Sequence, residues 1–134
     1  MRFFFKLASA AYISGIFLLA GSPELERLGQ FNPYSLLHIP LYGILTLLLI
    51  FSRWSSIFIN RGNPKNSIDP TNLSNLVVVG IIALVVAMAD EIYQSFIPFR
   101  DASVTDVFLD LIGISLVLIV LSQYYKKSRK AWGL

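Results

Sequence analysis

The sequence contains no cysteine and a single histidine, His38. The absence of cysteine excludes disulfide bonds, thiolate metal sites and cysteine nucleophiles. Any chemistry that this chain performs must therefore use oxygen atoms and one imidazole ring.

Charged residues are also scarce, at 14% of the 134 residues, whereas a soluble domain carries about 25%. Hydrophobic residues make up 55%, and the mean hydropathy is +0.66. A disordered tail and an ordinary cytosolic enzyme are excluded, because the chain lacks the polar surface to cover itself in water. The net charge is only +3, and the basic residues lie in tails and loops, which argues against nucleic acid as a partner.

Four long apolar runs are present, each near the roughly 20 residues that a transmembrane helix needs. We expect spans at residues 3–21, 34–51, 73–94 and 104–125. The Asn-, Ser- and Pro-rich segment 60–75 predicts an irregular loop. The predicted fold class is therefore all-α: an integral membrane four-helix bundle, forming a single transmembrane domain over residues 1–134 with the lipid bilayer around it.

The first span also resembles a secretory signal, because Arg2 and Lys6 precede an apolar run that ends in small residues at positions 20–22. Pro23 would follow the best cleavage site directly, where proline is poorly accepted. We therefore expect the first span to stay uncleaved, with removal of a signal as the alternative.

The basic residues predict the orientation, because cytoplasmic loops carry an excess of Lys and Arg. Nine of them lie in the two ends and the middle connection, which would share one side: Arg2, Lys6, Arg53, Arg61, Lys65, Lys126, Lys127, Arg129 and Lys130. The other two connections hold only Arg27 and Arg100. We predict a multi-pass protein of the cell membrane with both termini cytoplasmic and with loops 22–33 and 95–103 extracytoplasmic.

Ionisable residues gather at the predicted outer ends of the spans, although each costs about 2.5–3.5 kcal/mol in the middle of a membrane helix. They are His38 in the second span, Asp90 and Glu91 with Gln94 at the end of the third, and Asp106 and Asp110 at the start of the fourth. The cap and helix-initiating proline at 32–33, and the capping-box spacing from Ser103 to Asp106, predict where the second and fourth helices begin. His38 and Asp110 would then lie at matching depths.

Helical spacing places these residues on one face of each helix. The three faces carry His38 with Tyr42, Asp90 with Gln94, and Asp106 with Asp110 and Gly113. Lipid would leave the polar groups unsatisfied, so the faces must meet each other or a wet cavity. We expect an outward-opening polar pocket among the last three spans, with Gly113 allowing a second helix to approach below the acids.

Some of these residues have structural alternatives. Asp106 in a first helical turn is favoured by the helix dipole without any further role. Arg100 could clamp Asp90, Glu91 or both, and so pin the connection between the last two spans. Asp110 has no capping role, which favours a functional one. His38 is either a hydrogen-bonding core residue or, facing several carboxylates, a proton carrier or a metal ligand.

The run from Asp90 to Asp106 closely resembles the Asp-Glu-x-x-Gln-x-x-x-Pro-x-Arg-x-x-Ser-x-x-Asp signature of VanZ-like membrane proteins. Upstream, the spacing of His38, Tyr42 and Leu45 resembles the second motif of that family. The family usually has Asp-Lys where this chain has Tyr34-Ser35, and Asn where it has Asp110. The resemblance implies a bacterial multi-pass membrane protein of a family named for teicoplanin resistance, without supplying a reaction.

Three functions remain open. A cell-envelope binding protein would hold the head of a lipid-linked or glycopeptide-related ligand, with these contacts: Arg100, Gln94, Tyr42, Ser103 and Asp106. A membrane enzyme would use Asp90, Glu91, Asp110 and His38 as catalytic groups, or these four with Asp106 as ligands of a divalent cation. A proton-coupled transporter is less supported, because the ionisable groups lie on one side. The exposed spans also suit a homo-oligomer or a membrane-protein partner.

Overall fold

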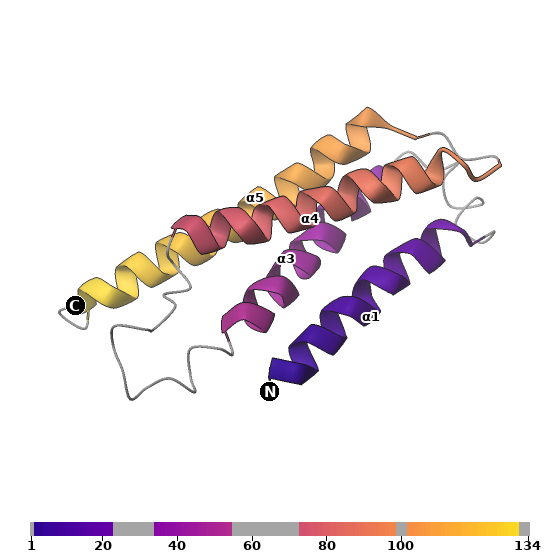
Figure 1. Cartoon of the computed structure of the whole chain (residues 1–134). Coiled ribbons are helices and arrows are strands. Elements are labelled where there is room, and N and C mark those ends of the chain that lie inside the picture. Colours follow the sequence, from indigo (N-terminus) through magenta and orange to yellow (C-terminus); the bar gives the residue numbers. More distant parts are fainter. Residues whose placement is uncertain (1, 23–33, 55–72, 99–101, 132–134) are drawn as a thin grey trace.

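The computed structural model describes residues 2–22, 34–54, 73–98 and 102–131 (Figure 1). These residues form four α-helices and no strand, which confirms the all-α prediction. The helices are α1 (Arg2–Ala20), α3 (His38–Trp54), α4 (Leu73–Gln94) and α5 (Val104–Ala131), and one 3-10 turn, η1 (Tyr34–Leu37), leads into α3. Pro23, Arg100 and residues 60–72 of the predicted irregular loop lie outside the described residues, whereas residues 73–75 of that predicted loop form the first turn of α4.

Helix α3 is the centre of the bundle and contacts each of the other three helices. Helix α5 packs on α3 and α4, while α1 lies along α3 on another side (Figure 1). At one end of the bundle α1 and α4 end and α3 and α5 begin, at Ala20, Gln94, His38 and Val104 respectively. This end, called the polar end below, lies opposite the start of α1 and the end of α5 (Figure 1).

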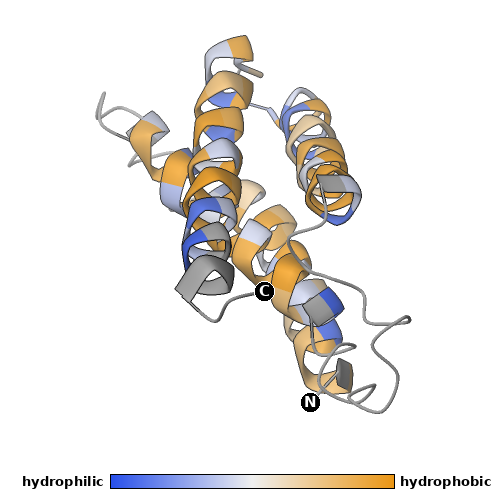
Figure 2. Cartoon of the chain, turned by 90° about the vertical axis from the view of Figure 1, so that its left-hand side faces the viewer, coloured by the Kyte–Doolittle hydropathy of each residue, from blue (hydrophilic) through white to orange (hydrophobic). Residues whose placement is uncertain are grey.

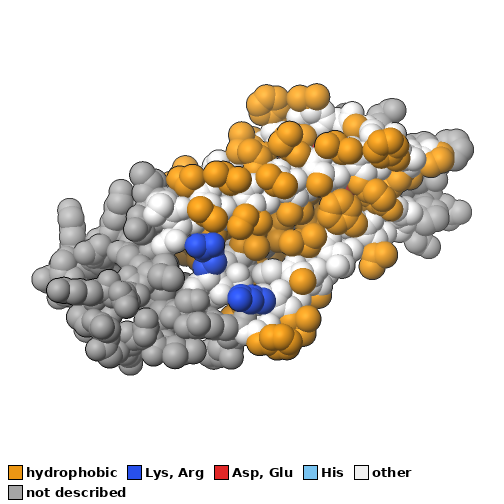
Figure 3. Space-filling model, in the orientation of Figure 1, with side chains coloured by type: hydrophobic (Ala, Val, Ile, Leu, Met, Phe, Trp, Pro, Cys, Tyr) orange, Lys and Arg blue, Asp and Glu red, His pale blue; other side chains and the backbone are white. Residues whose placement is uncertain are grey.

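All four helices are long and apolar enough to cross a membrane, over residues 3–20, 35–53, 74–94 and 104–124. Apolar residues make up much of the ribbons in Figure 2. Large apolar side chains such as Leu18 (77% exposed) and Phe108 (61%) lie on the surface of the bundle. On the face drawn in Figure 3, apolar side chains form a broad surface over the described residues, and no acidic side chain is visible. Such a surface suits lipid rather than water.

Small residues let the helices approach closely inside the bundle. Ala83 and Ala87 of α4 are fully buried against Tyr42 and Leu45 of α3. A Cβ atom on Gly113 of α5 would overlap the carbonyl oxygen of Ile39 and lie 3.0 Å from its carbonyl carbon. The prediction that Gly113 admits a neighbouring helix is therefore confirmed, and that neighbour is the first turn of α3.

The start of one helix differs from the sequence prediction. Helix α3 begins at His38 rather than after residue 33, because Pro40 has no N–H to donate to Leu36 and its ring disfavours an α-helical turn there. The chain forms the 3-10 turn η1 instead. Helix α5 continues to Ala131, and its part that is long and apolar enough to cross a membrane, residues 104–124, agrees with the fourth span predicted at 104–125.

Candidate acid–histidine site

Polar side chains from three helices meet at the polar end. Asp110 is fully buried, and Asp90, Glu91, Gln94 and His38 are each less than 9% exposed. With their hydrogen-bond partners they form what is called the acid–histidine cluster below: Ser35, His38, Tyr42, Asp90, Glu91, Gln94, Ser103, Asp106 and Asp110. Residues far apart in the chain thus share one buried site.

The His38 ring lies between two carboxylates of α5. Its Nδ1 atom is 2.9 Å from Oδ1 of Asp110, and its Nε2 atom is 4.0 Å from Oδ2 of Asp106. An ionised Asp110 can only accept, so Nδ1–H donates to it, and Nε2 is the ring nitrogen that faces Asp106. Ser35 holds Asp106 from the other side, because its Oγ donates to Oδ1 over 2.6 Å.

Asp90 is held from two helices. Its Oδ2 atom accepts from the hydroxyl of Tyr42 at 3.3 Å and from Nε2 of Gln94, one turn further along α4, at 3.1 Å. The Tyr42 ring is fully buried and stacks on the His38 ring, with the centroids 6.3 Å apart. Tyr42 therefore joins the α4 part of the cluster to the His38 part.

Glu91 holds the start of α5. Its Oε2 atom accepts from the backbone N–H of Ser103 over 2.8 Å. In the predicted capping box Asp106 would accept from that N–H, but in the structure Asp106 turns to Ser35 and His38 instead. The structure shows the helix start predicted at Ser103, whose carbonyl accepts from the N–H groups of Asp106 and Val107, but shows Glu91 as the partner of the Ser103 N–H.

Three buried carboxylate oxygens have no hydrogen-bond partner among the described residues: Asp90 Oδ1, Glu91 Oε1 and Asp110 Oδ2. A buried acceptor without a partner costs about 1–3 kcal/mol, and more when it carries charge. The Lys and Arg side chains that the structure describes, at positions 6, 53 and 127, belong to the first half of α1 and the ends of α3 and α5, away from the polar end. The cluster thus has hydrogen-bond acceptors that lack a donor among the described residues, and a donor or a cation bound there would stabilise it.

One group of residues is close enough to hold a metal ion. His38, Glu91 and Asp106 each offer a ligand atom, and these atoms lie within 4.8 Å of one another. Asp90 and Asp110 were also predicted as metal ligands but are outside this group. Among the described residues, Asp90 accepts from Tyr42 and Gln94, and Asp110 contacts His38.

The structure brings eight of the nine predicted site residues into the cluster, and the ninth, Arg100, lies outside the described residues. The sequence reasoning missed Ser35, which it treated only as a departure from the family pattern. Its position three residues before His38 was a signal, because that spacing returns a helix or a 3-10 turn to the same side.

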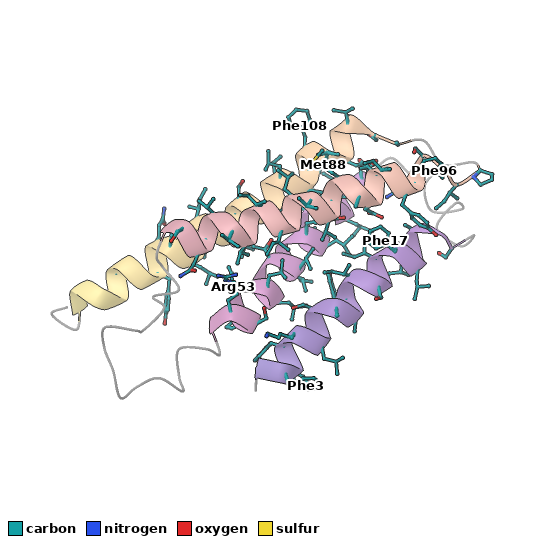
Figure 4. The ribbon with its side chains drawn as sticks, viewed as in Figure 1. Phe3, Phe17, Arg53, Met88, Phe96 and Phe108 are labelled. Atoms are coloured by element: carbon teal, nitrogen blue, oxygen red, sulfur yellow. The ribbon has the colours of Figure 1, made fainter. Side chains whose placement is uncertain are left out.

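A pocket of about 310 Å³ adjoins the cluster, between α1 and α3 rather than among the last three spans. Aliphatic residues make up most of its wall, including Ile16, Leu19 and Ile44, whereas His38 and Gln94 supply its polar part. Figure 4 shows Phe17 of α1 on the side facing α4, where its ring meets the edge of Tyr93 with centroids 5.6 Å apart. The predicted outward-opening pocket among α3, α4 and α5 remains a prediction.

Removing the Tyr42 hydroxyl tests how much the cluster stabilises the fold. Tyr42→Phe keeps the buried ring but takes one donor from Asp90, so we expect the free energy of unfolding to fall by about 1.5 kcal/mol. Tyr12→Phe is the matched control, because Tyr12 donates to the backbone carbonyl of Leu41. Its loss should be about 0.5–1 kcal/mol, since that acceptor is neutral. Thermal unfolding in detergent measures both, and a larger loss for Tyr12→Phe would contradict the prediction.

Together these features define a class: a four-helix membrane protein with carboxylate and imidazole side chains buried at one end of an otherwise apolar bundle. The VanZ/LLP1 family model matches residues 8–125, and the chain belongs to that family. The match includes every residue of the acid–histidine cluster. No curated protein and no solved structure gave a match.

Proposed function

We propose that this VanZ-like protein binds a lipid-linked component of the bacterial cell envelope. The polar head of the ligand lies at the acid–histidine cluster, and its apolar chain lies in the pocket between α1 and α3. The observation that carries the proposal is that His38 and Gln94 belong to both, so an aliphatic wall leads directly to buried polar groups. Ligand sites are mostly apolar with a few polar groups that fix orientation.

The proposal includes the orientation of the protein in the membrane and its organisation as a single transmembrane domain over residues 1–134. The polar end faces out of the cytoplasm and both termini face in, as the excess of Lys and Arg favours. The cluster is then near the outer surface, where envelope precursors are assembled and where glycopeptide antibiotics act. Binding there would mask or alter the target of teicoplanin, and Arg100 would hold an anionic group of the ligand.

A membrane enzyme is the second candidate, and the contact between His38 and Asp110 favours it. A carboxylate that holds one ring nitrogen leaves the other nitrogen free to exchange a proton with a bound ligand. Proton transport has less support. Among the described residues, the buried polar side chains outside the cluster are Ser9 and Thr46, which do not titrate.

The pocket is tested by filling it. Leu19 lines the pocket and Leu18 does not, although both are more than half exposed and adjacent in α1. Leu19→Trp should reduce binding of an added polyprenyl phosphate at least tenfold by native mass spectrometry, because the indole ring takes the space of the apolar chain. Leu18→Trp, which adds the same ring facing lipid, should bind like the wild type. Equal binding by the two variants would overturn the proposed pocket.

A further inference from the structure

We propose that His38, Glu91 and Asp106 bind a divalent cation, and that Asp110 positions the His38 ring for it. The inference deepens the proposed function and rests on it for the class of ligand. The cation gives the cluster a means of binding the oxygen atoms of a phosphate head, which four carboxylates alone would repel.

The three proposed ligands meet from different helices. His38 begins α3, Glu91 is in the last turn of α4, and Asp106 is in the first turn of α5. Ligand atoms around one ion bound at about 2.0–2.2 Å lie roughly 3–4 Å apart. The 4.0 Å between His38 and Asp106 fits that spacing, and the 4.8 Å limit of the group needs only a small contraction.

The burial of Glu91 is a second and independent observation that points to a ligand. Its side chain is within the group of possible ligands, the residue is 6% exposed, and Oε1 has no partner among the described residues. Asp110, which is fully buried and in contact with His38, also has an unpartnered oxygen. A cation among these groups would offset the negative charge that the described part of this end leaves unbalanced.

Asp110 acts through His38 rather than on the ion. Metal-binding histidines usually donate their second ring N–H to a carboxylate, which fixes the tautomer and the ring orientation. Asp110 is placed for this role, with Oδ1 2.9 Å from Nδ1, so that Nε2 carries the lone pair and faces Asp106. One imidazole with two carboxylates suits Mn²⁺ or Zn²⁺, and three protein ligands leave positions for a phosphate oxygen.

Because His38 is the only histidine, its binding has a unique spectroscopic signature. The chain is purified in detergent with a histidine-free tag and titrated with Mn²⁺. We expect one ion per chain and one imidazole nitrogen coupling in the electron spin-echo envelope modulation. His38→Gln should remove the coupling, and Glu91→Gln and Asp106→Asn should weaken Mn²⁺ binding at least 100-fold. A folded wild type without stoichiometric Mn²⁺, or without the nitrogen coupling, overturns the site.

Two further variants separate the effect of the His38 ring position from the effect of the negative charge of the cluster. Asp110→Asn should weaken Mn²⁺ binding about 10–100-fold and change the nitrogen coupling, because the ring loses its fixed orientation. Asp90→Asn removes one negative charge from the same cluster without removing a ligand, so binding should weaken only a few fold. If Asp90→Asn weakens binding as much as Glu91→Gln, the cluster attracts cations by charge alone and the assignment of ligands fails. Size-exclusion profiles and melting curves check that each variant is folded. The nitrogen coupling of the wild type tests the site even if a variant does not fold.

The class of ligand is tested on the Mn²⁺-loaded protein. Dodecyl phosphate should add a phosphorus coupling to the spectrum, whereas dodecyl maltoside should not. Mn²⁺ is measured without a lipid ligand, and Leu19→Trp tests the pocket without reference to metal. Bound Mn²⁺ with no effect of Leu19→Trp would overturn only the proposed pocket. If the protein binds the polyprenyl phosphate but binds no Mn²⁺, only the cation site is overturned.

Discussion

Gly113→Ala is expected to disrupt the packing of α5 on α3. The added methyl would overlap the backbone carbonyl of Ile39, with the carbonyl carbon at 3.0 Å and Cα at 3.1 Å. Backbone atoms cannot move aside as the end of a flexible side chain can, so the two helices must separate. We expect a loss of roughly 3 kcal/mol in the free energy of unfolding, at the upper end of overpacking costs.

Gly15→Ala is the matched control for this prediction. Gly15 is also within a helix, but a Cβ atom there has no neighbour within 4 Å. Thermal unfolding of the two variants in the same detergent separates the close approach from the general effect of replacing a helical glycine. Gly15→Ala should melt like the wild type or slightly above it, because alanine favours helix. Equal melting temperatures for the two variants would contradict the close packing at Gly113.

Asp110→Asn is expected to abolish any teicoplanin resistance that the wild-type chain confers on a sensitive Gram-positive host. The substitution keeps the shape of the side chain but removes its negative charge. It also places an amide N–H₂ group where Asp110 Oδ2 lies buried without an acceptor. His38 loses its charged partner, so both the position of its ring and the electrostatics of the cluster change.

The resistance assay compares minimal inhibitory concentrations at membrane levels matched by immunoblot. Thr105→Ala is the control, because Thr105 is an exposed residue in the first turn of the same helix, next to Asp106. It should keep full resistance, while Asp90→Asn should lose it with Asp110→Asn. Equal resistance in the wild type and both acid variants would show that the cluster is not needed for teicoplanin resistance.

Much of the bundle was predictable from residue types alone. The third span, predicted at 73–94, matches α4 in full, and the first differs from α1 by one residue at each end. These helices are set by apolar length, because the bilayer requires backbone hydrogen bonds to be made within the segment. The start of α3 was mispredicted because Asn32-Pro33 looks like a helix start, whereas Pro40 determines where α-helical hydrogen bonding begins.

Helical spacing also predicted which residues of the site share a face, since positions three and four apart lie together on any α-helix. Spacing cannot show which atoms meet between helices. Only the tertiary structure decided that Glu91 holds Ser103, that Ser35 holds Asp106 and that Asp110 takes one nitrogen of His38. Two of those contacts, Ser35 with Asp106 and His38 with Asp110, join the start of α3 to α5, the helices that approach closely at Gly113.

The sequence by itself determined that this is a VanZ-like chain with four apolar helices and polar residues at matching depths. The cost of placing carboxylates in lipid required that those residues face inward. The tertiary structure alone decided the rest: which three residues come within reach of one ion, and that the pocket lies between α1 and α3. Both depend on helix crossings and side-chain packing, which join residues up to 72 positions apart and leave no local pattern in the sequence.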